Sequence, residues 1–157
     1  MQATIKSVKG GLTAAKGFMA GGIKAGIKAS GKNDLALLYS TTKCSAAGTF
    51  TTNRIRASSV DWCEKLLPSS DIQVIVCNSG CANACTGDRG RSDTELFASL
   101  AAKGFGCAPK SALVASTGVI GHFLPQLLPP VVIHCCFCRV VISKEEFSKV
   151  LQRHLFI

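Results

Sequence analysis

Acidic residues are scarce in this sequence, and none occurs near its beginning. The 157 residues include 9 Asp and Glu against 18 Lys and Arg, a formal net charge of +9, and no carboxylate side chain precedes Asp34. Six lysines come before that point: Lys6, Lys9, Lys16, Lys24, Lys28 and Lys32. A basic surplus suits an anionic partner, namely a nucleic acid, a membrane surface or an acidic metabolite. A charge run of this kind is more often simply a solvated face.

Aromatic and charged residues are also few. Aromatic residues make up 6% of the chain, which leaves few side chains for nucleobases to stack on and argues against nucleic acid as the partner. A basic nucleic-acid-binding module nevertheless stays open as an alternative. The charged fraction of 17% and the hydrophobic fraction of 47% exclude a disordered chain. The length is sufficient for one domain with its own core.

The sequence has no long uninterrupted apolar run. Its beginning lacks the apolar segment of a secretory signal peptide. The most apolar stretch, residues 124–142, contains three prolines, a histidine and an arginine, which argue against a membrane-spanning helix. The nine cysteines are an odd number, and without a secretion signal we interpret them as reduced thiols. We therefore predict a cytoplasmic protein with no membrane partner.

The cysteines do not have the spacing of a zinc site. Cys77, Cys81 and Cys85 recur every four residues, but the glycine and asparagines between them make a helix doubtful. A second cluster consists of His134, Cys135, Cys136 and Cys138. Zinc ligands are normally paired as CxxC or HxxxH, and neither cluster has these pairs. We predict no metal site, because buried thiols acting as small hydrophobic side chains explain the pattern more simply.

The residue pattern predicts strands interleaved with two helices, and so a mixed α/β layered fold. Residues 10–33 indicate short strands and tight turns. Further strands are expected over 35–39, 46–52, 72–77 and 113–115. The first helix is expected over 58–67, before Pro68. The second is expected to begin at a capping box of Ser92 and Glu95, to have Leu96, Leu100 and Phe97 on its apolar face, and to end at the glycines of 104–106.

Three segments have residue types that could support chemistry. The small residues of 78–87 follow a strand, so backbone N–H groups could approach a ligand there and Asn side chains could orient it. Ser116-Thr117-Gly118 follows another strand, and a Thr hydroxyl beside a Gly N–H could stabilise a developing oxyanion. Arg54 and Arg56 could bind a carboxylate. Each segment by itself is equally typical of a tight turn or a solvated strand end.

Five segments taken together, in order, resemble the bifunctional ornithine acetyltransferase and glutamate N-acetyltransferase family of arginine biosynthesis. They are Gly10-Gly11-Leu12-Thr13-Ala14-Ala15-Lys16-Gly17-Phe18, Asp34-Leu35-Ala36-Leu37-Leu38, residues 46–54, residues 78–87 and residues 114–121. Cys81 stands where the family has Asn. The resemblance covers about residues 10–121, and five ordered segments are far more specific than any one of them.

The resemblance implies an α/β sandwich of the ornithine acetyltransferase type that is incomplete in this chain. It implies an acyltransferase that moves an acetyl group from N-acetylornithine, or from acetyl-CoA as a co-substrate, to glutamate by a ping-pong reaction with no bound cofactor. Thr117 and Gly118 match the oxyanion hole of the family. Family members cleave themselves before a threonine, which becomes the nucleophile of a second, carboxy-terminal chain, and the two kinds of chain form a heterotetramer.

The resemblance ends after Gly121. Residues 1–121 are expected to form the amino-terminal part of the domain. Residues 122–157 form a divergent tail whose composition is typical of a shifted reading frame, an altered transcript or a truncation. We find no candidate for the processing threonine there, so we expect the chain alone to be inactive. An alternative is a non-catalytic fragment that pairs with a full-length homologue.

Overall fold

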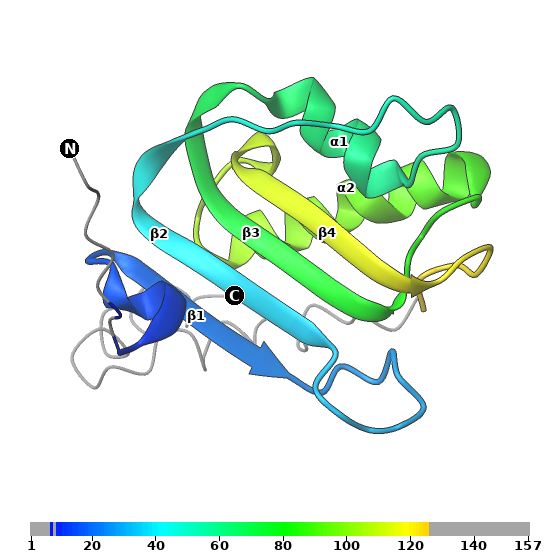
Figure 1. Cartoon of the computed structure of the whole chain (residues 1–157), viewed down its shortest axis with the longest axis horizontal. Helices are drawn as coiled ribbons and strands as arrows, with labels where there is room; N and C mark the ends of the chain where they lie inside the picture. The colour runs from blue at the N-terminus through cyan, green and yellow to red at the C-terminus, as the bar shows by residue number, and fades with distance from the viewer. Residues whose placement is uncertain (1–6, 8, 126–157) are drawn as a thin grey trace.

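A four-stranded sheet forms the framework of the structure, a computed structural model that describes residue 7 and residues 9–125 (Figure 1). The strands are β1 (Phe18–Ile23), β2 (Leu35–Ala46), β3 (Ser69–Cys81) and β4 (Ala112–Val119). The helices are α1 (Ser58–Leu66) and α2 (Gly87–Gly104), with short 3-10 turns η1 (Gly11–Ala14) and η2 (Pro109–Ser111). The predicted mixed α/β class is confirmed. The tail predicted over 122–157 lies outside the described residues from residue 126 onward.

The strands lie in the order β1-β2-β3-β4, and the sheet is mixed, with both antiparallel and parallel pairs. β1 with β2 and β2 with β3 are antiparallel, whereas β3 and β4 are parallel. Parallel neighbours need a crossover, and α2 supplies it between β3 and β4. The carboxyl ends of β3 and β4 and the first turn of α2 therefore meet at one end of the sheet, where α/β proteins commonly bind ligands.

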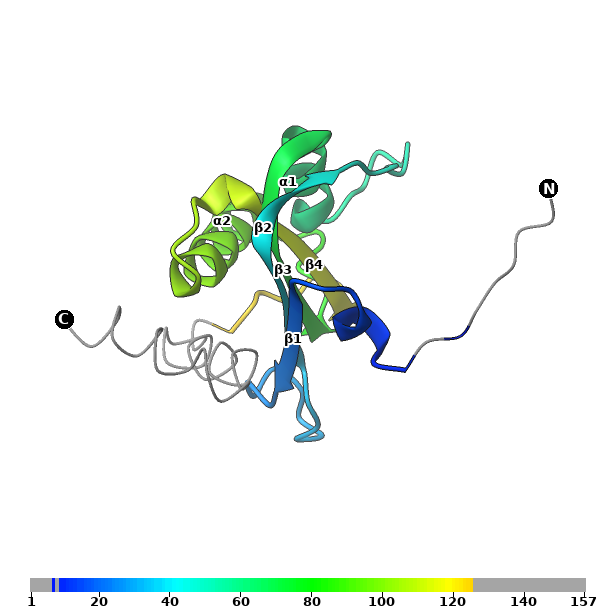
Figure 2. The same ribbon diagram turned by 90° about the vertical axis from the view of Figure 1, so that its left-hand side faces the viewer.

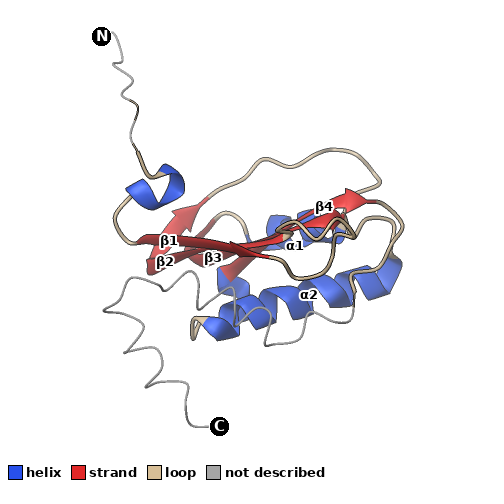
Figure 3. Ribbon diagram, turned by 90° about the horizontal axis from the view of Figure 1, so that it is seen from below, coloured by secondary structure: helices blue, strands red, loops and turns tan. Residues whose placement is uncertain are grey.

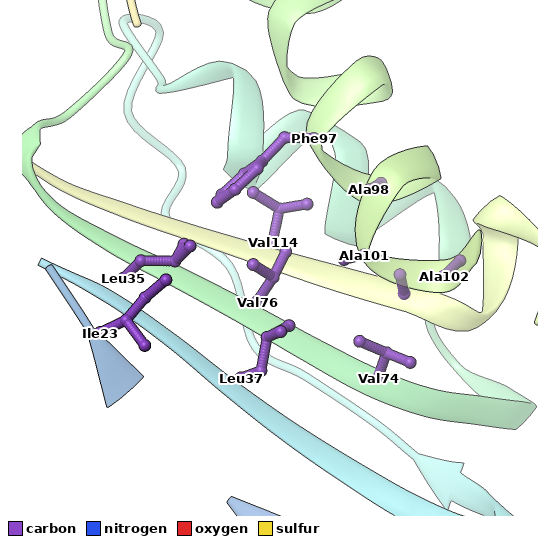
Figure 4. Packing of buried hydrophobic residues seen from close by; sticks show 11 residues of the cluster. Ile23, Leu35, Leu37, Val74, Val76, Phe97, Ala98, Ala101, Ala102 and Val114 are labelled. Carbon is purple, nitrogen blue, oxygen red and sulfur yellow. The ribbon is translucent and has the colours of Figure 1, made fainter. Parts of the chain in front are cut away.

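The hydrophobic core lies between α2 and one face of the sheet (Figure 4). Alternate residues of the strands point toward the helix, as the two-residue period of a strand requires. Val74 and Val76 of β3 are fully buried there and pack with Phe97, Ala98 and Ala101 of α2. The small alanines let the helix approach the sheet closely. Figure 3 shows α2 beneath the sheet along most of its length.

Helix α1 stabilises the outer edge of β4. The indole Nε1–H of Trp62 donates to the carbonyl oxygen of Ala112 at 2.9 Å, and the Cys63 thiol donates to that of Val114 at 3.3 Å. Trp62 also packs against the core cluster, so α1 closes the edge of the core next to β4, while α2 lies to one side of the strands (Figure 2). An uncovered strand edge invites pairing with another chain, and α1 removes that risk along the first half of β4.

The second face of the sheet is also apolar but much less covered. The register aligns Ala20, Leu38, Ile75 and Leu113 in one row across all four strands. Leu38, Ile75 and Leu113 are only half-buried, and Ala20 is exposed. Within residues 9–125, α2 packs on the other face and α1 packs along the edge of β4. This row therefore lacks the helix layer that buries Val74 and Val76.

Two expectations about secondary structure are wrong. The strand expected over 46–52 ends at Ala46, because residues 47–52 are largely exposed and do not pair with the sheet. The second helix begins at Gly87 rather than near Ser92, and its N-cap residue is Thr86. Its buried face consequently includes Phe97, whereas Leu96 is 57% exposed. The helices expected to end before Pro68 and at the glycines after residue 103 do so. No helix in the described part of the chain is long and apolar enough to cross a membrane.

Candidate functional site

Thr117 and Gly118 lie at the carboxyl end of β4, inside the strand rather than in a turn after it. Their partners in the parallel register are Ser79 and Gly80 of β3. Both Thr117 and Gly118 are exposed, so their polar groups are accessible to a ligand. The structure thus positions the pair that the sequence singled out at the end of the sheet where α2 begins.

Gly118 lies closely against the backbone of β3. Its φ of +130° lies in the region that favours glycine. A Cβ on Gly118 would lie 2.6 Å from the backbone nitrogen of Cys81 and 2.7 Å from the carbonyl oxygen of Gly80. Real side chains do not tolerate such distances, so this position requires glycine for space as well as for conformation.

Gly80 is in turn packed against the loop that joins β1 to β2. Its φ is +111°, and a Cβ there would lie 2.9 Å from Cγ of Lys28 and 3.2 Å from Cγ2 of Ile27. The aliphatic stem of Lys28 therefore lies directly over Gly80. Lys28, Gly80 and Gly118 form a stack in which two glycines bring three chain segments together.

Asp34 folds that loop. Its carboxylate accepts hydrogen bonds from the backbone N–H groups of Ala25 at 2.6 Å, Ile27 at 2.7 Å and Lys28 at 2.8 Å. The side chain is 3% exposed. Burial by itself would raise the pKa of Asp34, but the N–H bonds from Lys28, Ala25 and Ile27, together with the Lys28 charge, lower it below its usual value. The carboxylate thus stays ionised and fixes the loop around itself.

Asn78 and Ser116 are paired in the register two residues before the Gly80–Gly118 contact. The Asn78 side chain is 3% exposed, and its Nδ2 donates to the carbonyl oxygen of Cys81 at 2.8 Å. This bond shapes β3 around Gly80. Asn78 Oδ1 and Ser116 Oγ are buried and have no hydrogen-bond partner in the structure. The two unpaired oxygens belong to neighbouring side chains on the α2 face of the sheet.

The rest of the 78–87 run forms a polar network that begins α2. Asn83 is fully buried with a positive φ of +48°, and its Nδ2 donates to the carbonyl oxygen of Gly90 and to Thr94 Oγ1. The Thr86 hydroxyl donates to Asn83 Oδ1 at 2.9 Å. A Cβ at Gly90 would lie 2.8 Å from Asn83 Oδ1. This segment therefore attaches α2 to the end of the sheet, and the hydrogen bonds of the Asn83 side chain are already used within that network.

The cysteines of the run do not come together as a cluster. Cys77 is half-buried in β3, Cys81 is buried, and Cys85 is exposed in the turn before α2. Burial raises the pKa of Cys77, and the nearby Cys63 raises it further. In the part of the chain that the structure describes, no group of three or more His, Cys, Asp or Glu residues could hold a metal ion. The second predicted cluster, around His134, lies outside that part.

Arg56 binds carboxylates, but those of its own chain. Its guanidinium pairs with Asp61 at 2.8 Å and with Glu64 at 2.7 Å, both on α1. Arg54 is exposed in the connection before that helix. Arg56 therefore serves the attachment of α1, and its charge is already paired.

Sequence reasoning missed the contribution of the β1–β2 loop. It interpreted Lys28 as one of six lysines on a solvated face and gave Asp34 no role. One signal was present: Asp34 is the first carboxylate of the chain and directly precedes a buried strand. Its three N–H partners become visible only when the loop returns on itself.

Comparison with known proteins identifies the family. The sequence profile of the ArgJ family matches residues 19–129. The chain is 52% identical over 118 residues to the arginine biosynthesis bifunctional protein ArgJ of Dehalococcoides mccartyi, covering 74% of this chain and 29% of that protein. It is 51% identical over 123 residues to the protein of the same name from Streptomyces coelicolor, covering 76% and 32%. The chain thus spans about a third of the length of these relatives.

Two solved structures have the same fold. The arginine biosynthesis bifunctional protein ArgJ of Bacillus halodurans superposes with a TM-score of 0.74 at 35% identity, covering 80% of this chain and 65% of that one. The ornithine acetyltransferase of Mycobacterium tuberculosis, solved as a complex with ornithine, gives a TM-score of 0.77 at 38% identity, covering 81% and 69%. With most of its described residues matched in sequence and in structure, the chain belongs to the ArgJ family.

Proposed function

We propose that this chain is the amino-terminal part of an acetyltransferase that transfers an acetyl group from N-acetylornithine to glutamate, with Thr117 and Gly118 as its oxyanion hole. The family membership, whose relatives are arginine biosynthesis bifunctional proteins, supports the reaction class. The solved relative that binds ornithine supports the donor side of the reaction. Acetyl-CoA is the alternative donor that the family resemblance suggests, and no bound cofactor is required.

The geometry of Gly118 is the observation that supports this role most directly. Trp62 and Cys63 bind the carbonyls of Ala112 and Val114, so even-numbered residues of β4 direct their backbone groups away from β3. The same alternation directs the N–H of Gly118 to that edge, beside the exposed Thr117 hydroxyl. Because Gly118 is held against Gly80, this donor is fixed before a substrate arrives.

Acyl transfer needs such fixed donors. When a nucleophile attacks the acetyl carbonyl, its oxygen gains negative charge, and two preorganised donors stabilise that charge without reorganising. Thr117 Oγ–H and Gly118 N–H would donate to this oxygen. The nucleophile would be a threonine in the longer part of the relatives that this chain does not match. An acyl-enzyme on that threonine would then pass the acetyl group to glutamate.

A second chain is the partner that we propose for the uncovered face of the sheet. Leu38, Ile75 and Leu113 form an apolar row that neither described α-helix covers. Exposed apolar patches of this kind mark interaction surfaces. The curated relatives extend to about three times the length matched here, and their carboxy-terminal part would cover this row within a heterotetramer. A cytoplasmic location is part of the same proposal.

The proposal is tested in a chimera, in which residues 19–125 replace the matching segment of the Dehalococcoides mccartyi relative. Formation of ornithine from N-acetylornithine and glutamate is the readout. Thr117→Ala should lower kcat by roughly 10²–10³-fold with little change in KM, because one oxyanion donor is lost. Thr42→Ala, at an exposed threonine in β2, is the matched control and should leave kcat unchanged. A folded, active chimera that tolerates Thr117→Ala would exclude the proposed oxyanion hole.

A further inference from the structure

A cavity of about 470 Å³ lies beside the Gly80–Gly118 contact. The β1–β2 loop borders it on one side, and the segment that follows β4 borders it on the other. Figure 1 shows that this loop and the ends of β3 and β4 lie at the same end of the sheet. The volume is within the range of small-molecule sites.

The polar groups that line the cavity are suited to an anion. Lys28, Ser30 and His122 are the lining residues with polar or basic side chains, and no Asp or Glu lines the cavity. Lys28 has no ion pair with any residue that the structure describes. Its stem lies over Gly80, so the ammonium is kept near the cavity instead of extending freely into solvent.

The remaining walls are apolar. Ile27, Val119 and Phe123 provide most of this surface. The guanidinium carbon of Arg89 lies 4.1 Å from the centre of the Phe123 ring and packs against it, while the Arg89 charge is paired with Asp93 at 3.7 Å. A ligand that matches both surfaces has an anionic head and a short apolar body.

Both sides of the cavity are fixed by hydrogen bonds. The Asp34 carboxylate binds the backbone N–H groups of Ile27 and Lys28. The Cys81 thiol donates to the carbonyl oxygen of His122 at 3.2 Å, which ties the second side to β3. A cavity held in this way loses little entropy when it binds a ligand.

We propose that this cavity binds a small organic carboxylate with a short aliphatic chain. The carboxylate accepts hydrogen bonds from Lys28, Ser30 and His122, and the aliphatic chain packs on Ile27 and Phe123. Thr117, at the exposed end of β4, does not line this cavity, so the site is separate from the proposed oxyanion hole and does not depend on the acyltransferase function.

Calorimetric titration of the full chain with butyrate tests the proposal. Butyramide has the same shape without the charge, and inorganic phosphate has charge without the apolar chain. Butyrate should bind at least about tenfold more tightly than butyramide, because the neutral amide cannot form a charge-assisted hydrogen bond with the charged donor. It should also bind at least about tenfold more tightly than phosphate, which has no apolar chain. Added salt should lower the affinity for butyrate, because salt screens the attraction between the charges.

Three variants locate the site. Lys28→Met keeps the aliphatic stem over Gly80 but removes the charge, and should weaken butyrate binding about tenfold or more. Lys28→Arg should restore most of the affinity. Lys32→Met, at an exposed lysine of the same loop, is the matched control and should bind as the parent does. Thermal melts establish that each variant is folded.

Each outcome decides the proposal. Butyrate binding that is lost in Lys28→Met and kept in Lys32→Met supports it. Absence of butyrate binding by the folded parent chain overturns it, as does binding that is equal for butyrate and butyramide or unaffected by Lys28→Met. Preferential binding of phosphate over butyrate also overturns it, because the apolar walls would then have no part in recognition.

Discussion

The backbone carbonyl of Asp34 accepts a hydrogen bond from the N–H of Ser79 at 2.8 Å. The same residue folds the β1–β2 loop through its side chain, which accepts three further N–H bonds. Asp34 therefore joins the lysine-rich loop to β3 directly beside the Gly80–Gly118 contact. One carboxylate sets the position of a segment that sequence reasoning regarded as a solvated surface.

Asp34→Asn should destabilise the protein by about 1–3 kcal/mol at pH 7, because an amide cannot accept all three N–H bonds without bringing its own N–H₂ close to a donor. Urea denaturation measures the difference. Asp71→Asn, which removes an exposed ion pair with Lys43, is the control and should cost much less, because solvent screens that pair. Equal costs for the two variants would contradict the role given to Asp34.

Acidification should reduce the contribution of Asp34. Its pKa in the folded protein is below the ordinary value of 3.8, so its stabilisation is fully present above about pH 4 and is lost as the pH falls through the folded pKa. The stability difference between parent and Asp34→Asn should therefore shrink below pH 4. A difference that stays constant from pH 7 to pH 3 would show that the carboxylate charge is not the cause.

Gly118→Ala should destabilise the sheet more than an ordinary glycine substitution. A Cβ there meets the backbone of Gly80 and Cys81 and also strains a φ of +130°. Gly121→Ala is the matched control, because its φ is +79° but nothing lies within 4 Å of the added Cβ. Gly118→Ala should cost about 1–3 kcal/mol more than Gly121→Ala in chemical denaturation. Similar costs would mean that β3 can move away from β4.

The variant Asn83→Gly distinguishes the stability that the polar network contributes from the cost of the strained backbone at this position. Glycine relieves the positive φ of +48° but leaves Thr86, Thr94 and the Gly90 carbonyl without their shared partner, so we expect a loss of about 2–4 kcal/mol. Cys85→Gly removes strain at a φ of +58° on an exposed residue and should be neutral or slightly stabilising. A neutral Asn83→Gly would show that the network does not anchor α2.

The described cysteines should differ in their reactivity toward iodoacetamide at neutral pH. Burial raises the pKa of the Cys63, Cys77 and Cys107 thiols, which reduces the reactive thiolate, whereas Cys85 is exposed. Peptide mass spectrometry should find Cys85 labelled at least about tenfold faster than Cys77. In guanidinium chloride the two rates should converge. Equal rates in the folded protein would contradict the burial of Cys77.

The sequence pattern predicted the elements whose signal is local. Helix α1 has apolar residues at helical spacing and a following proline, and it is found where expected. Thr117 and Gly118 were expected directly after a strand over 113–115; they lie at the carboxyl end of that strand, but inside it, because β4 extends to Val119. Their chemical role stays a prediction, and so does the domain boundary after Gly121.

The remaining features depend on contacts between segments distant in the chain. The start of α2 was predicted too late in the sequence, because Gly87 and Gly90 are poor helix formers. Only the structure shows why position 90 is a glycine: it packs closely on Asn83. Strand β3 continues to Cys81 through the small residues of 78–81, because β4 pairs with it there. The cavity beside Lys28 is formed by the β1–β2 loop, β3 and the segment after β4. These segments are distant in the sequence, so no local residue pattern predicts the cavity.

The attachment of α1 to β4 has a consequence for synthesis on the ribosome. Trp62 and Cys63 find their acceptors at Ala112 and Val114, which are 50 and 51 residues later in the chain. At about 5–20 residues per second, the helix is made several seconds before the strand that it stabilises. During that interval the indole and the core surface around it lack their partner. The nascent chain is therefore most exposed to premature association, or to capture by a chaperone, between the translation of α1 and that of β4.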